Sequence, residues 1–313
     1  MFAEILKMTR PKNIAIAVVT LVVGYALLKD FPYSIGLVLQ AFGFAFAIGF
    51  ANIQNDILDL ESDKMNRPER TFVTGKVSVK AARRAWIIMF ALMLLCGVGD
   101  SLISYFGRLN LGHLPSLPMQ IVCYSSPLWF FLLLGLLLVA YNKKLKHIPL
   151  LKNMTVAFLC TTPLLYAALN YYVFNGYVWP ESALLGLMGV VPAIPFAFLL
   201  TTAREIYKDL EDETGDLKAG IMTFPLIAGS ATARRLAGAI MVFTWISLPV
   251  PVFCMDRFFG SNYDLLFLYI TAATLTPCFA YVLVQAHKKN YRKAQSAVKV
   301  GMFLGLIALI VSC

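Results

Sequence analysis

Residues 35–63 read IGLVLQAFGFAFAIGFANIQNDILDLESD, a stretch that joins a long apolar run to a cluster of amides and carboxylates. The apolar part, residues 35–54, has the length of about 20 residues that a helix needs to cross the hydrocarbon core of a bilayer. A segment in lipid must satisfy its own backbone hydrogen bonds, so it forms a helix. The stretch therefore predicts a membrane helix that ends in a polar cluster.

Similar apolar runs recur along the 313-residue chain, which is 59% hydrophobic and only 14% charged, whereas a soluble domain is about a quarter charged. We predict an all-α polytopic membrane bundle that forms a single domain over residues 1–313. Prolines within the runs are expected to kink or break helices, namely Pro163, Pro192, Pro195, Pro249, Pro251 and Pro277. Nine spans are expected, at residues 14–29, 35–54, 85–100, 121–140, 153–172, 183–202, 236–254, 264–285 and 297–312.

The positive charges gather on one side of the membrane. Of the 27 Lys and Arg residues, all except Lys29, Arg108 and Arg257 lie in the amino-terminal segment or in and beside the loops after the even-numbered spans. Cytoplasmic loops carry such an excess, so we predict a multi-pass cell-membrane protein with its amino terminus and these loops in the cytoplasm. Orientation and anionic lipid explain the net charge of +10, and neither a nucleic-acid partner nor an obligate protein partner is predicted.

Most of the 17 acidic residues fall in two short stretches, each at the predicted cytoplasmic end of a span. The first contains Asn52, Asp56, Asp59 and Asp63, and the second contains Glu205, Asp209, Asp212 and Asp216. Both sets have the offsets 0, 4, 7 and 11, which on a helix form one narrow face. The shared pattern indicates two related halves that bring these two stripes face to face. Gly215 is a candidate terminator of the second helix, which would leave Asp216 in the following loop.

Carboxylates packed this closely repel one another unless a cation lies between them. Mg²⁺ suits such a site, because it binds one or two carboxylates, keeps some waters and bridges to substrate phosphates. A diphosphate neutralised in this way is a good leaving group. The cations expected to bind phosphate oxygens lie in the same cytoplasmic loops: Arg67, Arg70, Lys143, Lys144, Lys146, Arg204, Lys208 and Lys218.

These residues resemble the UbiA superfamily of intramembrane prenyltransferases along almost the whole chain. Its first motif, NxxxDxxxD, is matched by Asn55, Asp59 and Asp63, and its DxxxD motif by Asp212 and Asp216, with Asp209 a turn earlier. The resemblance implies Mg²⁺ and diphosphate ligands with catalytic aspartates at 59, 63, 212 and 216. The full set of candidate metal ligands is Asn55, Asp59, Asp63, Asp209, Asp212 and Asp216. The candidate substrate-binding residues are Arg10, Asn52, Arg70, Tyr141, Lys144, Lys146, Glu205 and Lys208.

Within the superfamily, the segments 204–220, 141–146 and 10–13 look most like the archaeal-type digeranylgeranylglyceryl phosphate synthases. This resemblance implies transfer of a geranylgeranyl group from geranylgeranyl diphosphate to the hydroxyl of geranylgeranylglyceryl phosphate. An aromatic acceptor, as in quinone, haem or chlorophyll synthesis, is the alternative, since the donor chemistry would be unchanged.

A transporter is the main alternative that is not an enzyme. Transporter carboxylates tend to lie near the bilayer midplane, whereas these lie at helix ends. A phosphotransferase of the CDP-alcohol type would carry a DGxxAR signature, which is absent. The six cysteines and three histidines are scattered without metal-ligand spacing, and none is given a catalytic role.

Overall fold

The computed structural model describes residues 2–32, 34–66, 68–109, 117–175, 186–218, 220–256 and 265–311, and these residues contain helices and no strand. The fold is therefore all-α, as predicted. The helices are α1 (Phe2–Met8), α2 (Pro11–Leu28), α3 (Ser34–Leu58), α4 (Leu60–Asn66), α5 (Val79–Leu109), α6 (Leu117–Tyr124), α7 (Ser126–Lys143), the 3₁₀ turn η1 (Leu145–His147), α8 (Leu151–Asn175), α10 (Ala193–Lys218), α11 (Phe224–Ala228), α12 (Ser230–Ile246), the π-helix η2 (Pro251–Asp256), α14 (Leu265–His287) and α15 (Tyr291–Val311).

Eight segments of the described chain are long and apolar enough to cross a membrane, one fewer than the nine predicted. They correspond to all of the predicted spans except the sixth, and the polytopic character of the chain is confirmed. The eight segments are Pro11–Leu28, Ser34–Leu58, Val79–Phe106, Ser126–Lys143, Leu151–Val173, Ser230–Cys254, Leu265–His287 and Tyr291–Val311.

The sixth predicted span, residues 183–202, differs from the structure. Its first three residues lie outside the described chain, residues 188–192 form turns, and α10 begins only at Ala193. Pro192 and Pro195 flank this start, where proline is tolerated because the first helical N–H groups have no intrahelical partner. From there α10 runs to Lys218, so much of the helix is charged rather than apolar.

The other internal prolines have two outcomes. Pro163 and Pro277 lie within the continuous helices α8 and α14, so neither breaks its helix. Pro163 has no N–H to donate to the carbonyl of Leu159, and the hydroxyl of Thr162 donates to that oxygen instead, at 2.7 Å. Pro249 and Pro251 do end a helix: α12 stops at Ile246, and a turn and the π-helix η2 follow.

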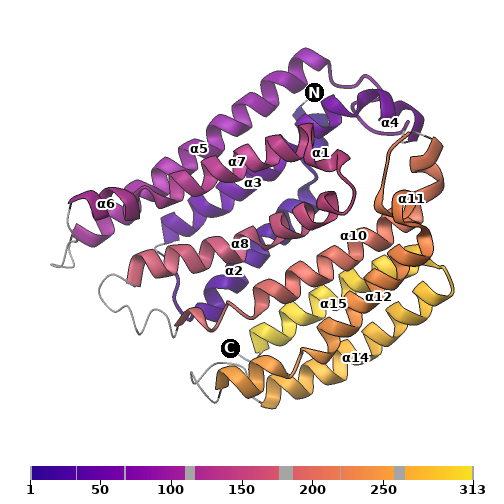
Figure 1. Ribbon diagram of the computed structural model, residues 1–313. Coiled ribbons are helices and arrows are strands. Elements are labelled where there is room, and N and C mark those ends of the chain that lie inside the picture. The colour runs from indigo at the N-terminus through magenta and orange to yellow at the C-terminus, as the bar shows by residue number, and fades with distance from the viewer. Residues whose placement is uncertain are drawn as a thin grey trace. The chain divides into compact units, whose positions relative to one another are not determined.

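The helices group into two compact units. The first contains most of the described residues up to Lys144. In it, α3, α5 and α7 pack side by side (Figure 1). Phe131 of α7 is fully buried, with its ring centroid 5.4 Å from that of Phe44. Gly43 of α3 lies directly against the Phe131 ring, so the close approach of α3 and α7 depends on a missing side chain.

The second unit contains most of the residues from Leu145 onward, together with Val23–Lys29. Helices α10, α12, α14 and α15 form its core, and α10 packs against both α12 and α15 (Figure 1). Buried side chains on α10 include Ala203, Ile206 and Tyr207, each fully inaccessible to solvent. One face of α10 is thus fixed in the apolar core, and its charged residues lie around the rest of the helix, where Glu211 and Glu213 contact α15 and α12.

Replacing Gly43 by alanine should destabilise the first unit by about 1–3 kcal/mol, because the added methyl group would overlap the buried Phe131 ring. Gly305→Ala in α15 is the matched control, since a Cβ there meets no atom within 4 Å and alanine favours helix. The unfolding free energies of both variants in mixed micelles test this. Equal effects would contradict the packing described for Gly43.

Candidate functional site

The acidic stripe of the first unit lies where α3 passes into α4. Helix α3 ends at Leu58 and α4 begins at Leu60, with Asp59 in a turn between them. The helical hydrogen bonding nevertheless continues through the turn: the Asp59 N–H donates to the Asn55 carbonyl at 2.9 Å, and the Asp63 N–H donates to the Asp59 carbonyl at 2.7 Å. The periodicity expected for a continuous helix is therefore largely retained.

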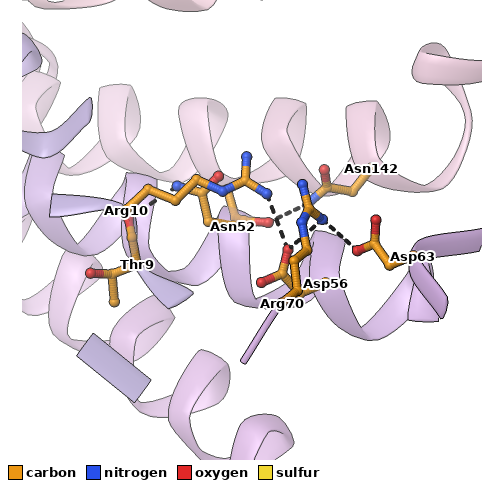
Figure 2. A network of polar contacts seen from close by, with 8 residues as sticks. Thr9, Arg10, Asn52, Asp56, Asp63, Arg70 and Asn142 are labelled. Atoms are coloured by element: carbon orange, nitrogen blue, oxygen red, sulfur yellow. Dashed lines mark hydrogen bonds and ion pairs between the residues drawn. The ribbon is translucent and has the colours of Figure 1, made fainter. Parts of the chain in front are cut away.

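Two buried carboxylates of this stripe share one guanidinium. Arg70 forms ion pairs with Asp63 and, at 3.3 Å, with Asp56 (Figure 2). Arg10 pairs with the same Asp56 oxygen at 3.1 Å. The carboxylate side chains are only 8% and 11% exposed, so these arginines supply the charge compensation that closely packed carboxylates require. Four of the residues singled out from the sequence are thus brought together.

Arg70 reaches the stripe because its loop is anchored in an apolar cluster. Phe72 and Val77, which follow Arg70 in the connection between α4 and α5, are 5% and 3% exposed. They pack in one cluster with Met8 and Ile53, from α1 and α3. Burial of these side chains stabilises the loop by about 1.5–3 kcal/mol per residue and holds the guanidinium over the stripe.

Amide side chains tie other segments to α3. Asn52 donates to the Thr9 carbonyl at 3.1 Å, so it holds the turn that carries Arg10 rather than facing open space (Figure 2). Asn142 of α7 donates to the Ala51 carbonyl at 2.8 Å and to the Gln54 side chain at 3.0 Å. Asn142 was not among the residues predicted from the sequence. It fixes the end of α7 to the helix that bears the stripe.

The predicted substrate residues at the end of α7 occupy different environments. Tyr141 is half-buried in the last turn of α7, next to the Asn142 anchor. Lys144 caps α7 with its backbone N–H and its side chain is exposed, whereas Lys146 lies in η1 and is half-buried. Arg10 also lines an open groove of about 570 Å³. Among the other predicted phosphate-binding cations, Arg67 lies outside the described residues.

The acidic stripe of the second unit runs along α10. Asp209 is 3% exposed, and both its oxygens are occupied by residues at the start of α8. Lys152 donates to one oxygen at 2.7 Å, and Asn153 donates to the other at 2.8 Å. Asp209 was predicted as a metal ligand, but its contacts make it an anchor for α8 in this structure. Glu205 is equally buried and pairs with Arg204 at 2.7 Å and Lys208 at 3.7 Å.

Gly215 does not end α10, and that expectation was wrong. The helix continues to Lys218, so Asp212 and Asp216 both remain on it. The residue that terminates α10 is Gly220, whose φ of 68° is accessible to glycine at little energetic cost. The Gly220 N–H donates to the Leu217 carbonyl at 3.2 Å, and the Ile221 N–H donates to the Asp216 carbonyl at 2.9 Å. This is the Schellman pattern, which satisfies the last carbonyls of a helix.

The donor chemistry of both stripes fits Mg²⁺. In the described chain no three His, Cys, Asp or Glu side chains converge on one point. Mg²⁺ does not need such a cage, because it usually takes one or two carboxylates and completes its shell with water and substrate phosphate. In the second stripe, the carboxylates of Asp212 and Asp216 are half-buried and form no ion pair among the described residues. To bind the metal, the Asp63 carboxylate would have to give up its ion pair with Arg70.

Lys152 and Asn153 are functional candidates that the sequence reasoning missed. A signal was present, because Lys152-Asn153 at the start of α8 repeats Lys12-Asn13 at the start of α2. In both places the residue two positions before the lysine, Leu150 or Arg10, has a positive φ, of 63° and 57° respectively.

Arg70→Met should lower the unfolding free energy by about 3 kcal/mol, because it leaves two buried carboxylates without their shared cation. Lys64→Met breaks the exposed Lys64–Glu61 pair and should cost less than about 1 kcal/mol. Unfolding of the metal-free protein in mixed micelles compares the two. A cost for Arg70→Met no greater than that for Lys64→Met would contradict the charge-compensation role.

The stability of the metal-free protein should depend on pH through Asp216. Burial raises the pKa of Asp216 from its ordinary value of 3.8 to about 6, with repulsion from Asp209 and Asp212 adding to this effect and Lys152 opposing it. The folded state therefore binds the proton more tightly than the unfolded chain does. The contribution of Asp216 to the free energy of unfolding consequently falls as pH rises from about 4 to about 6. Asp216→Asn should raise Tm more at pH 7.5 than at pH 5 in EDTA. Equal shifts in Tm at both pH values would contradict a raised pKa of Asp216 in the folded state.

Comparison with known proteins places the chain among membrane prenyltransferases. It is 33% identical over 310 residues to the digeranylgeranylglyceryl phosphate synthase of Methanopyrus kandleri, with 98% of each chain covered. It is 28% identical over 305 residues to the synthase of that name from Methanobrevibacter smithii, with 96% of this chain and 95% of the relative covered.

Solved structures share the fold. A structure of a digeranylgeranylglyceryl phosphate synthase matches with a TM-score of 0.66 at 23% identity, and the match covers 99% of this chain and 98% of the other. A UbiA homologue from Archaeoglobus fulgidus bound to GPP and Mg²⁺ matches with a TM-score of 0.57 at 18% identity over 99% of both chains. Residues 17–307 match the UbiA prenyltransferase family, and the chain belongs to that family.

Proposed function

We propose that this prenyltransferase transfers a geranylgeranyl group from geranylgeranyl diphosphate to the hydroxyl of geranylgeranylglyceryl phosphate. The observation that carries the proposal is the similarity, over nearly the full length of both chains, to several digeranylgeranylglyceryl phosphate synthases. Family membership also removes the ground for a transporter. We further propose that the chain works as one domain, with both stripes on the cytoplasmic side of the cell membrane.

Mg²⁺ is the proposed cofactor, and the A. fulgidus homologue bound to GPP and Mg²⁺ supports this assignment. When bound, Mg²⁺ would neutralise the negative charge that develops on the departing diphosphate. The proposed ligands in the first unit are Asn55, Asp59 and Asp63. In the second unit they are Asp212 and Asp216, because Asp209 is already occupied by Lys152 and Asn153.

The chain's own residues would act by binding and charge compensation. Arg70 and Arg10 present guanidinium groups beside the first stripe, and such groups bind phosphate oxygens through paired N–H donors. In the reaction, the bond between the allylic carbon and the diphosphate oxygen breaks, and the electron pair leaves with the diphosphate. The acceptor hydroxyl oxygen forms the new carbon–oxygen bond and releases its proton to water. Acid–base chemistry is secondary in this scheme.

The test is an assay of the purified protein with geranylgeranyl diphosphate and Mg²⁺. Geranylgeranylglyceryl phosphate and 4-hydroxybenzoate are offered as acceptors in parallel. We expect diether lipid product and none with EDTA. Prenylated benzoate in place of diether lipid would overturn the acceptor assignment and leave the donor chemistry standing.

Asp63→Asn should reduce the rate by at least about 100-fold, because the carboxylate belongs to the proposed metal site. Glu61→Gln is the matched control on the same helix, since Glu61 is exposed and pairs only with Lys64 among the described residues. Steady-state kinetics measure both variants. If Asp63→Asn kept the activity of Glu61→Gln, the proposed metal site at the first stripe would be wrong.

A further inference from the structure

The proposed acceptor carries a phosphate of its own, so an enzyme for it needs an anion site besides the one for the donor diphosphate. The stripe residues and Arg70 are assigned to the donor and its metal. The remaining cations of the second unit differ in their partners and in their position along the helices. One group stands apart: Arg204 and Lys208 on α10, and Lys299 on α15.

Helix packing brings these three cations to one place. Gln295 of α15 donates to the Glu211 carboxylate of α10 at 3.0 Å, which fixes the register of the two helices. Lys299 lies one turn beyond Gln295, and Lys208 lies about one turn before Glu211 on α10. Lys299 consequently interacts electrostatically with Arg204 and Lys208, and also with the carboxylates of Glu205 and Glu211.

The cations are only partly compensated. Glu205 pairs with Arg204 and Lys208, and Glu211 is bound to the Gln295 amide. Three positive charges thus face two carboxylates. Within the part of the chain that the structure describes, Lys299 forms no hydrogen bond or ion pair, and the buried Arg204 Nε donates none. Two cationic donors in one cluster therefore lack an acceptor.

The position of Lys299 makes this arrangement costly without a ligand. Lys299 lies eight residues into α15, about 12 Å along a helix that is otherwise apolar beyond it. An ionisable side chain within a membrane-spanning helix is expensive and marks a functional site by default. The partner that relieves the cost is an anion that reaches the cluster from within the membrane layer.

We infer that Arg204, Lys208 and Lys299 form the binding site for the phosphate of the lipid acceptor. This inference rests on the function proposed above. A phosphate monoester supplies several acceptor oxygens and up to two negative charges, which matches one free ammonium and one unpaired guanidinium N–H. Its apolar chain would keep the ligand in the membrane layer, where Lys299 lies.

The test measures binding without turnover. Wild-type protein, Lys299→Met and Lys293→Met are placed in phosphatidylcholine nanodiscs without Mg²⁺ or donor. Lys293 is the matched control, because like Lys299 it is exposed and lies on α15, but it lies outside the cluster. Geranylgeranylglyceryl phosphate and the uncharged geranylgeranylglycerol are titrated in turn, and phosphatidic acid serves as a competing phosphate monoester that is not the acceptor.

We expect Lys299→Met to weaken binding of geranylgeranylglyceryl phosphate about tenfold and to leave binding of geranylgeranylglycerol unchanged. Lys293→Met should bind both ligands as the wild type does. Equal loss of both ligands would show a structural role and overturn the inference, as would no loss. Competition by phosphatidic acid equal to the acceptor's own affinity would also overturn it, in favour of a general lipid headgroup site. Binding through Lys299 without prenyl transfer to this acceptor in the activity assay would contradict the proposed function alone.

Discussion

Neutralisation of buried carboxylates at helix ends is the constraint on which the arrangement of this protein depends. A buried carboxylate without a cation costs several kcal/mol, so each one determines where a partner must lie. Asp56 and Asp63 place Arg10 and the loop bearing Arg70, whereas Asp209 places the start of α8 through Lys152. The charged groups that suit the chain to anionic substrates thus also position the surrounding helices and loop.

Much of this could be predicted from the sequence, because lipid makes periodicity and composition unusually informative. Apolar length located eight of the spans, and the repeated acidic offset identified both stripes. The starts of three helices were predicted too late. Helices α5, α12 and α15 begin at Val79, Ser230 and Tyr291, each six residues before the predicted span. Backbone hydrogen bonding continues beyond the apolar run, so hydropathy marks the lipid-facing part of a helix rather than its start.

Pairings between distant segments could not be predicted in the same way. Arg70 was selected as a phosphate ligand from its place in a basic loop, but its contact with Asp63 depends on the burial of Phe72 and Val77. Lys152 was counted only as a topological charge, although the repeat of Lys12-Asn13 was visible. Lys299 was counted with the basic residues beside the last loop although it lies within the predicted span 297–312, and only the packing of α15 on α10 shows its neighbours. Side-chain partners across helices depend on rotation and register, which hydropathy does not specify.

The Arg70 contact makes the loop an internal competitor for any cation that binds Asp63. A guanidinium attached through an anchored loop has a high effective concentration at the carboxylate, of the millimolar order typical of short tethers. The apparent affinity of the free ion for Asp63 is then weaker than it would be without Arg70. This affinity depends on how firmly the burial of Phe72 and Val77 holds the loop. Substitutions in that apolar cluster, remote from any ligand, would therefore shift the ion concentration at which the site fills.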